Sequence, residues 1–390
     1  EGEGGLEPVG LTGLPRVVSW WRGLTDGRST PAGFDAVLAA VLVMLSVPYG
    51  IVSSLMMWAR ALSPSKCDVP VVSVGNIVVG GAGKTPLTVY LARVLSRAGR
   101  RVAVVSRGYG RRSSGTVIVS KGERPLVDCR DAGDEPYLIS MLTKGVCVVV
   151  SERRTDGVRC AVDKLGADAV VLDDAFQHVG LSRDLDVVAV DASRPVGNGF
   201  MFPGGPLREP PTGIMRAGVI VATRCDVAGG AARIRSTVGA LVPEVPVVET
   251  RMKPVEFWDV GTGDTLSSSE VKRLRCLALS SIADPSDFEG TLTRLGVEVA
   301  GRLALPDHHD YSDDDVSVIV EAAREIGADA VVTTEKDAVR LRPWRSRRRL
   351  VALGIELEVT SGEEHLRSAL RSALGVGGHD GIRAIRADVR

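Results

Sequence analysis

A glycine-rich turn in the first third of the chain carries the residues best suited to chemistry. Residues 80–85 read Gly-Gly-Ala-Gly-Lys-Thr, and Pro86 follows them. Glycines let backbone N–H groups converge on phosphate oxygens, a lysine ammonium reaches the β- and γ-phosphates, and a threonine hydroxyl suits Mg²⁺. The pattern predicts a nucleotide-binding phosphate loop made of Gly80, Gly81, Ala82, Gly83, Lys84 and Thr85. Alone, it does not separate a kinase from a GTPase or an ATPase.

The residues around this turn predict a strand before it and a helix after it. Residues 69–74 form a valine-rich run, and Leu87, Tyr90 and Leu91 recur at helical spacing. Pro86 falls in the first helical turn, where its missing N–H costs little. These flanks favour a phosphate loop over a chance glycine-rich turn, although Val78 stands where the usual pattern has glycine.

Paired carboxylates follow two further segments. Asp173 and Asp174 come directly after the apolar run 169–172, where a Walker-B-type acid holds Mg²⁺. Asp134 and Glu135 follow a glycine and precede a predicted helix. They are candidates for a base and a metal ligand, and the alternative is an ordinary acidic first turn of a helix.

Polar residues in loops complete the candidate set. Gln177 and His178 continue the Asp-Asp loop, so we expect them to face the same crevice. Residues 197–209 form a glycine- and proline-rich loop that ends in Arg and Glu, and loops of this length are usually functional. His308 and His309 lie among acidic residues, which fits a surface loop, a metal site or one catalytic histidine that reaches across an interdomain cleft.

Composition narrows the class of protein. Lys plus Arg and Asp plus Glu both number 48, so nucleic-acid binding has no electrostatic support. The six cysteines are scattered and have no paired short spacing. They predict reduced core thiols in a cytosolic compartment, not a zinc site or a disulfide framework.

The N-terminal region contains a long apolar segment. Residues 36–59 carry no charge and are long enough to cross a bilayer. Pro48 interrupts the segment, and a true span would export the arginines that precede it, against the positive-inside bias. We therefore expect a membrane-bound helix or helical hairpin on the cytoplasmic face, with a true span or a buried soluble helix as alternatives. A stripe of small or polar residues suits packing on protein or lying in the interface: Ser46, Tyr49, Gly50, Ser53 and Ser54.

Apolar runs alternate with helical patterns through the rest of the chain, which predicts a doubly wound, mostly parallel α/β sheet. A second set of runs after Cys276 predicts a smaller α/β domain. The predicted strands are 102–106, 146–150, 169–172, 187–190 and 219–222, then 277–279, 297–300, 330–333 and 350–353. The predicted parts are a loosely ordered 1–33, a membrane-associated helix 34–62, a nucleotide domain 63–253, a crossover 254–269, a smaller domain 270–374 and a flexible tail 375–390.

In their order along the chain, these motifs resemble those of the tetraacyldisaccharide 4'-kinase family of lipid A biosynthesis. The resemblance runs from about Val69 to Glu358, and the family shares the non-glycine position at Val78. Its motifs here are Val74-Gly75-Asn76, residues 80–86, 106–110, 133–136, 173–178, 204–209, 306–308 and 334–339.

The resemblance implies a P-loop NTPase-like fold and a lipid kinase. The γ-phosphate of ATP would pass to the 4'-hydroxyl of a tetraacylated glucosamine disaccharide 1-phosphate, with Mg²⁺, at the cytoplasmic face of the inner membrane. The implied partners are the lipid disaccharide and the membrane surface, and we expect no nucleic acid and no obligate protein partner.

The resemblance also implies roles for single residues. Asp134 would be the base, paired with His308 when the two domains close, and Lys84 would contact the transferred phosphate. His309 is expected to be a bystander. Mg²⁺ would be held by Thr85 and Glu135 with one or both of Asp173 and Asp174. The expected substrate-binding residues are Arg107, Gln177, His178, Asn198, Arg208 and Glu209.

Two departures and one alternative remain. Ala175 replaces a glycine of the family motif, and residues 280–285 differ from the family's glycine-containing turn.

Residues 223–226 read Thr-Arg-Cys-Asp, which is close to the Thr-Lys-x-Asp motif that binds guanine. The alternative function is therefore a GTPase or a nucleotide-dependent metallochaperone. Arg224 weakens it, because it stands where Lys would pack on the base. A non-catalytic scaffold is disfavoured because Lys84, Asp134 and Asp173 are all retained.

Overall fold

The computed structural model describes residues 20–21, 23–25 and 32–375. The predictions for most of 1–33 and for the tail after residue 375 lie outside these residues. By their contacts the described residues divide into two units: a smaller one formed by Lys253–Glu356, and a larger one formed by the described residues before Lys253 and from Leu357 onward.

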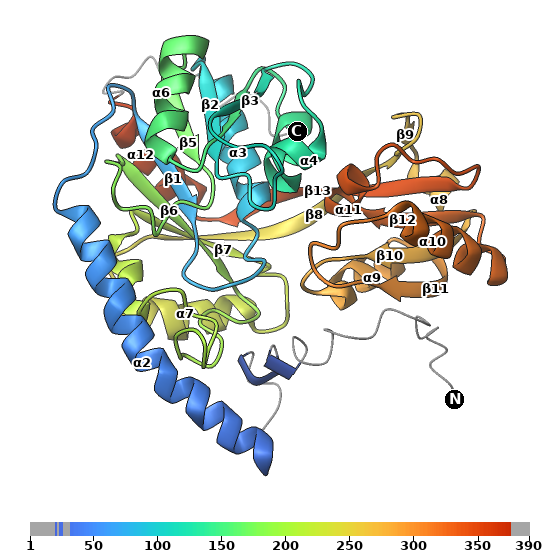
Figure 1. Cartoon of the computed structure of the whole chain (residues 1–390), viewed down its shortest axis with the longest axis horizontal. Helices are drawn as coiled ribbons and strands as arrows, with labels where there is room; N and C mark the ends of the chain where they lie inside the picture. Colours follow the sequence, from blue (N-terminus) through green and yellow to red (C-terminus); the bar gives the residue numbers. More distant parts are fainter. Residues whose placement is uncertain (1–19, 22, 26–31, 376–390) are drawn as a thin grey trace. The chain divides into compact units, whose positions relative to one another are not determined.

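The larger unit is built on a mostly parallel sheet, as predicted (Figure 1). Its strand order is β8-β7-β6-β1-β5-β2-β4-β3, and only the β3–β4 pair in this order is antiparallel. Valine-rich runs suit such strands because both of their faces are buried. The strands are β1 (Val71–Gly75), β2 (Val102–Ser106), β3 (Val117–Lys121), β4 (Cys147–Val150), β5 (Ala169–Leu172), β6 (Leu185–Asp191), β7 (Val219–Thr223) and β8 (Val247–Asp259).

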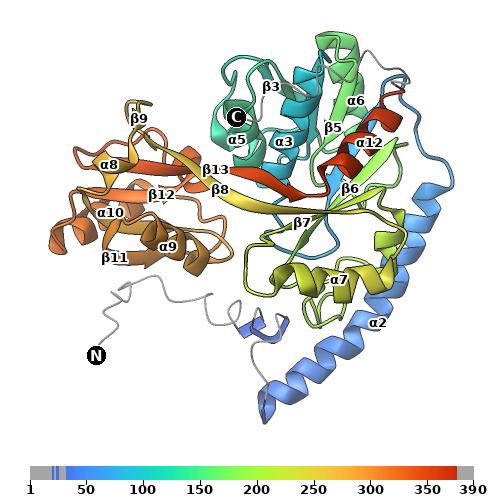
Figure 2. The ribbon, with the colours of Figure 1, turned by 180° about the vertical axis from the view of Figure 1, so that it is seen from behind.

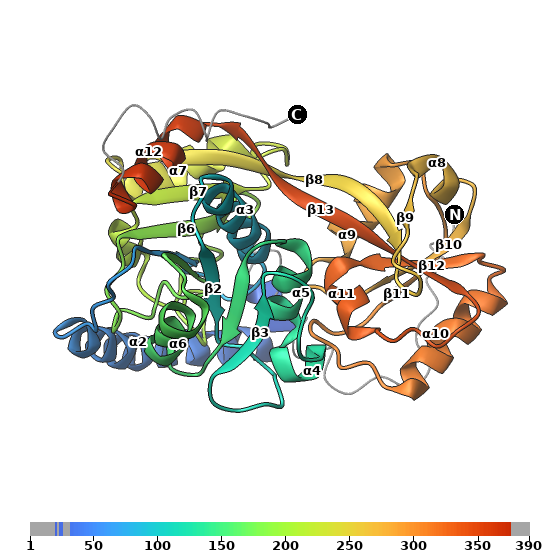
Figure 3. The ribbon, with the colours of Figure 1, turned by 90° about the horizontal axis from the view of Figure 1, so that it is seen from above.

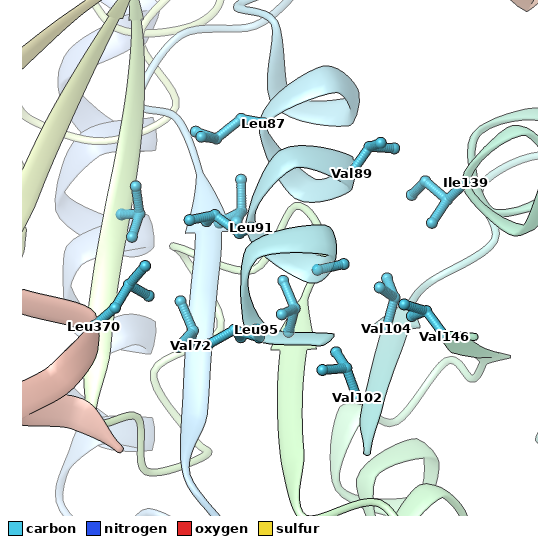
Figure 4. Packing of buried hydrophobic residues seen from close by; sticks show 14 of the residues in the cluster. Val72, Leu87, Val89, Leu91, Leu95, Val102, Val104, Ile139, Val146 and Leu370 are labelled. Carbon is cyan, nitrogen blue, oxygen red and sulfur yellow. The ribbon is translucent and has the colours of Figure 1, made fainter. Parts of the chain in front are cut away.

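Helices cover both faces of this sheet. Successive strand residues point to opposite faces, so Val72 packs in one core cluster with Leu91 of α3, while Val71 packs in another with Val158 of α6. Figure 3 shows α3 and α6 on opposite sides of the sheet, and Figure 4 shows the α3 leucines directed toward the strands. The helices are α3 (Lys84–Arg97), α4 (Cys129–Ala132), α5 (Asp134–Leu142), α6 (Arg154–Leu165), α7 (Gly230–Leu241), α12 (Glu363–Ala373) and the 3₁₀ helix η1 (Pro211–Arg216).

The smaller unit contains four parallel strands in the order β11-β10-β12-β13. On one face, Leu279 packs in a cluster with Ile319 of α10, and on the other, Ala278 packs with Leu292 of α9. Its elements are β9 (Thr265–Leu266), α8 (Ser268–Val271), β10 (Arg275–Ser280), α9 (Pro285–Arg294), β11 (Glu298–Ala304), α10 (Asp313–Glu325), β12 (Ala330–Thr334), α11 (Glu335–Arg340) and β13 (Arg349–Ser361).

The structure differs from the predicted domain limits at two places. The predicted crossover 254–269 contains the end of β8, then β9 and the start of α8. The chain from Leu357 onward groups with the larger unit because Leu366 and Leu370 of α12 pack into its core, beside β6 and β7 (Figure 2). The middle of β8 is exposed or half-buried, so its sequence does not show the pattern of buried apolar residues that predicts a strand.

The apolar N-terminal segment forms one continuous helix, α2 (Phe34–Ala61). The hairpin alternative is therefore wrong. In the described part of the chain, α2 is the one helix long and apolar enough to cross a membrane, and only 11% of its most apolar window is buried, which disfavours a buried soluble helix.

Small residues of α2 contact the loop formed by residues 197–209. Ser46 Oγ donates to the carbonyl of Met201 at 2.7 Å and accepts from the amide of Gly204 at 3.0 Å. A side chain at Gly50 would meet Met201 Sδ at 2.9 Å. A groove of about 600 Å³ lies between α2 and this loop. The predicted small stripe thus packs on protein at Ser46 and Gly50, and the large apolar side chains of the helix remain exposed.

Candidate active site

The phosphate loop connects β1 to α3 (Figure 1). Gly80 and Gly83 have φ of 114° and 76°, a region that favours glycine. A Cβ at Gly83 would lie 3.0 Å from Thr223 Cγ2, so a larger residue would not fit. No side chain caps the N-terminus of α3. Its first N–H groups are therefore suited to an anion such as a phosphate.

Lys84 is the first residue of α3 and lies among polar groups. Its Nζ is 3.4 Å from Asn76 Oδ1 and 3.6 Å from Asp174 Oδ1, and only 10% of its side chain is exposed. Burial lowers the pKa of Lys84, and the negative charge of Asp174 opposes that change. The side chain of Lys84 is therefore a largely desolvated cation with a carboxylate beside it, and it is suited to bind an anionic group.

Asp173 is buried at the end of β5. Its two carboxylate oxygens accept hydrogen bonds from Thr88 Oγ1 at 3.0 Å and from Ser106 Oγ at 2.9 Å. Burial, and then the negative charges of Glu135 and Asp174, raise its pKa to about 6. Three carboxylates therefore gather beside the phosphate loop. Sequence patterns did not predict Thr88 or Ser106, although Thr88 lies one helical turn after Lys84 and Ser106 ends β2.

Asp174 forms the second anionic group of the site. It has a φ of 46°, which is uncommon for a residue other than glycine. Arg208 Nη1 lies 2.9 Å and 3.2 Å from its two oxygens. Burial opposes ionisation, but Lys84 and Arg208 together hold the pKa of Asp174 below its usual value. Arg208, predicted to bind substrate, thus contacts Asp174, and its substrate contact stays a prediction.

Asp134 and Glu135 begin α5, as predicted. The Glu135 amide donates to Asp134 Oδ1 at 2.9 Å, and the charge of Glu135 raises the pKa of Asp173. Gly133 has a φ of 86°, and a Cβ there would lie 3.1 Å from Gly108 Cα. This close approach sets the loop that contains the exposed Arg107 beside the start of α5.

Arg154 supports the floor of the site, and sequence patterns did not single it out. It is 4% exposed, and its guanidinium donates to the carbonyls of Asp173 at 3.1 Å and Ser151 at 3.2 Å. Its Nε has no hydrogen-bond partner among the described residues. Arg154 begins α6, four residues after the end of β4, and its position in the sequence does not mark it as a site residue.

Gln177 and Glu209 make hydrogen bonds within the protein. Gln177 Nε2 donates to the carbonyl of Asn76 and to Glu209 Oε1, both at 2.8 Å. Glu209 is fully buried and also accepts from Arg216 Nη2 at 2.7 Å. The carboxylate of Glu209 thus holds the Arg208 loop through protein groups, and its predicted contact with substrate stays a prediction.

Asn198 likewise shapes its own loop. Its Nδ2 donates to the carbonyl of Gly204 at 3.0 Å, and its Oδ1 accepts from the amide of Phe200 at 3.1 Å. These bonds fix the conformation of the turn that packs against α2. The predicted contact between Asn198 and substrate stays a prediction.

His178 lies half-buried near several arginines. Burial, and then the charges of Arg154, Arg60, Arg183 and Arg107, lower its pKa from 6.5 to about 4. The imidazole is therefore neutral at pH 7. A neutral ring surrounded by cations is suited to an anionic ligand.

The free energy of unfolding is expected to fall below pH 6.5 partly because of His178. Its folded pKa lies below its unfolded one, so the unfolded chain takes up the proton first, and stability is lost as the pH drops from 6.5 toward 4. Urea unfolding of His178→Gln should show a smaller loss between pH 7 and pH 5 than the parent. His365→Gln, at an exposed site on α12, is the control, and equal losses in both variants would contradict the assignment.

His308 lies in the smaller unit and has a φ of 60°. Its Nε2 is 3.4 Å from Lys336 Nζ and 3.9 Å from Asp307 Oδ1. The neighbouring His309, predicted to be a bystander, lies 3.2 Å from Asp315 Oδ2. Asp134 and His308 belong to different units, and their pairing stays a prediction.

The oxygen donors beside the phosphate loop suit a hard cation. Thr85, Glu135 and Asp173 supply hydroxyl and carboxylate oxygens, the ligands that Mg²⁺ prefers. A divalent cation would also offset the repulsion that raises the pKa of Asp173. Among the described residues, no group of three or more His, Cys, Asp or Glu side chains is placed so that it could hold a metal ion. A hard cation here would need further oxygen ligands, such as phosphate and water oxygens.

The chain is similar to known proteins over most of its length. Residues 38–375 match the family described as tetraacyldisaccharide-1-P 4'-kinase. A tetraacyldisaccharide 4'-kinase of Anaeromyxobacter sp. (strain Fw109-5) is 44% identical over 319 residues, which cover 81% of this chain and 85% of the relative. One of Anaeromyxobacter dehalogenans (strain 2CP-C) is 39% identical over 368 residues, with 92% and 95% covered.

A solved structure agrees with this similarity. The crystal structure of LpxK from Aquifex aeolicus in complex with ATP aligns with a TM-score of 0.72 at 30% identity. The alignment covers 86% of this chain and 99% of that one. The structural similarity therefore extends over both units of the chain and is not limited to the phosphate loop.

Proposed function

Because the chain belongs to the tetraacyldisaccharide-1-P 4'-kinase family, we propose that it transfers the γ-phosphate of ATP to the 4'-hydroxyl of a tetraacylated glucosamine disaccharide 1-phosphate. The chain is thus a phosphotransferase with an alcohol acceptor in lipid A biosynthesis. The observation that carries the proposal is the group formed by Lys84, Asp174 and the buried Asp173 at the phosphate loop. Residues 223–226 resemble a guanine-binding motif, but the match to the kinase family covers most of the chain. We therefore no longer favour a GTPase as the alternative function.

Phosphoryl transfer depends mainly on positioning and on charge stabilisation. In the proposed reaction, the loop amides and Lys84 hold the β- and γ-phosphates. The 4'-hydroxyl oxygen forms a bond to the γ-phosphorus, the bond from that phosphorus to the β,γ-bridging oxygen breaks, and ADP leaves. Asp134 takes the hydroxyl proton, and His308 orients Asp134 or raises its basicity once the two units close around the substrates.

Magnesium is part of the same proposal. Mg²⁺, when bound, neutralises charge that builds up on the phosphates. Thr85, Glu135 and Asp173 would hold it. Asp174 is engaged by Lys84 and Arg208, so its part would be to keep Lys84 directed at the phosphates. Arg107 and Arg208 would meet the disaccharide or its 1-phosphate, since guanidinium groups suit phosphate. The neutral ring of His178, which lies near arginines, would meet the same ligand.

A direct assay tests the function. Purified protein in detergent is incubated with ATP, Mg²⁺ and the disaccharide 1-phosphate, and the lipid is analysed by mass spectrometry for a second phosphate. We expect phosphorylation with ATP and much slower turnover with GTP. Absence of product with authentic substrate, or a clear preference for GTP, would overturn the proposal.

We further propose that α2 attaches the protein, as a peripheral or monotopic helix, to the cytoplasmic face of the inner membrane. Its exposed side chains include Val41, Met44, Val52 and Trp58, each at least 45% exposed. An exposed apolar helix face of this extent gains free energy by entering the bilayer interface.

A single charge on α2 is expected to weaken membrane binding at least about tenfold. Burial of one valine contributes about 1.5–3 kcal/mol, and a glutamate at the same position loses that free energy. Val52 and Val318 are 56% and 52% exposed, and Val318 lies on α10 of the smaller unit. In co-sedimentation with vesicles of mixed zwitterionic and anionic phospholipid, Val52→Glu should bind less and Val318→Glu should match the parent. Equal binding of all three proteins would exclude α2 as the anchor at this position.

A further inference from the structure

The segment Thr223-Arg224-Cys225-Asp226 lies against the phosphate loop. Thr223, at the end of β7, is fully buried, and its Oγ1 donates to the carbonyl of Ala82 at 3.1 Å. Arg224 has a φ of 56°, and its Nη2 donates to the carbonyl of Gly81 at 3.3 Å. Two adjacent residues of the segment therefore hold two adjacent carbonyls of the loop.

These bonds fix the direction of the loop's amides. A trans peptide places its C=O and its N–H on opposite sides. Holding the carbonyl of Ala82 therefore turns the N–H group of Gly83 away from β7, while the N–H of Ala82 donates to the carbonyl of Gly80 at 3.1 Å. Phosphate loops bind anions through such N–H groups, so their orientation sets the affinity for phosphate.

Asp191 keeps Arg224 in this position. It is 5% exposed, its Oδ1 accepts from the amide of Ser193 at 2.9 Å and from the Ser193 hydroxyl at 2.7 Å, and its Oδ2 pairs with Arg224 Nη2. Arg194 Nε lies 3.6 Å from the same Oδ2. A buried carboxylate with this many donors is fixed in place, and it holds the Arg224 guanidinium on the loop.

We propose that Thr223, Arg224 and Asp191 form a loop clamp that orients the phosphate loop and so determines the affinity for the nucleotide phosphates. The clamp residues are positioning residues, because they act through the carbonyls of Gly81 and Ala82. This inference rests on the proposed function only in taking ATP as the ligand. It also gives the Thr-Arg-Cys-Asp segment a role other than guanine recognition, since Arg224 is turned onto the loop.

The sharpest test compares two buried threonines. Thr250 is also fully buried, and its Oγ1 donates to the carbonyl of Ala222 at 2.9 Å, one residue before the clamp and away from the phosphate loop. Thr223→Val and Thr250→Val each remove one short buried hydroxyl-to-carbonyl bond, and Thr223→Val also removes a longer contact of 3.5 Å to the carbonyl of Val190. Both variants should lose similar stability, but only one of them changes the loop.

We expect Thr223→Val to raise the Kd for a fluorescent ATP analogue and the KM for ATP about five- to tenfold, the effect of one lost hydrogen bond. The KM for the lipid should stay unchanged. Thr223→Ser, which keeps the hydroxyl, should restore binding, and Arg224→Gln should weaken ATP and ADP alike. The Kd values are measured at a temperature where thermal melting shows every variant to be folded.

Two results would overturn the clamp: parent-like ATP binding by Thr223→Val, or equal weakening by Thr223→Val and Thr250→Val. A shift in the KM for the lipid as large as the shift for ATP would also contradict it, because that pattern indicates general distortion. The proposed function fails separately. If the parent protein binds ATP but phosphorylates no disaccharide, the binding comparison still decides the clamp.

Discussion

Lys84→Met is expected to lower kcat for lipid phosphorylation by two or more powers of ten. The Lys84 ammonium is largely desolvated at the start of α3, where burial lowers its pKa, and it lies 3.6 Å from Asp174. A charge contact in a water-poor site is worth more than one in water, and removing such a contact costs about a hundredfold or more in rate. Methionine keeps most of the side-chain volume, so the packing of α3 is retained. Turnover is measured with saturating ATP and lipid.

The matched control is Lys144→Met, which removes a lysine from an exposed position of the same unit. It should leave both turnover and the ATP-dependent rise in thermal melting temperature unchanged. Lys84→Met should lose most of that rise, because it lacks the cation that meets the phosphates. The assignment fails if Lys84→Met turns over within a few-fold of the parent while it still melts as a folded protein.

The sequence predicted the framework of the site because strong local patterns mark it. Runs such as 102–106 and 169–172 coincide with β2 and β5, since residues buried on both faces leave no alternation. The carboxyl ends of parallel strands lie at one edge of a sheet. The gathering of Asp173, Asp174 and Lys84 therefore followed from sequence order alone.

The supporting residues could not be predicted, because their partners are distant in sequence and carry no spacing signal. Arg154 reaches the backbone of Asp173, and Arg216 reaches buried Glu209. Such bonds arise from tertiary packing and leave no periodic trace. For the same reason, sequence patterns did not indicate that the carboxylate of Glu209 faces inward, and its predicted contact with substrate stays a prediction.

The clamp segment shows how a motif misleads when its context is missing. Thr223 and Arg224 suggest guanine recognition by residue type. The left-handed backbone at Arg224 instead turns its side chain toward Gly81 and Asp191. Backbone conformation at a single residue, which sequence patterns do not give, decides which group the side chain meets.

Asp134→Ala, His308→Ala and the double variant are each expected to lose about two or more powers of ten in kcat, and to about the same extent. A positioned base contributes about a hundredfold or more. If His308 acts only by orienting Asp134 or raising its basicity, its removal adds nothing once Asp134 is gone, because residues that act as a unit are strongly non-additive. The cycle is measured as kcat with saturating ATP and lipid, with the KM for ATP as a check on the phosphate loop.

Asp314→Ala and Asp131→Ala serve as controls that remove other acids of the same two units, and both should turn over like the parent. Asp131 lies in α4, three residues before Asp134, and Asp314 is exposed on α10, six residues after His308. Near-normal turnover of Asp134→Ala would contradict the base assignment. Multiplicative losses in the double variant would instead show that the two residues act independently. Because Asp134 and His308 belong to separate units, a non-additive result would also be direct evidence that the units close on each other during turnover.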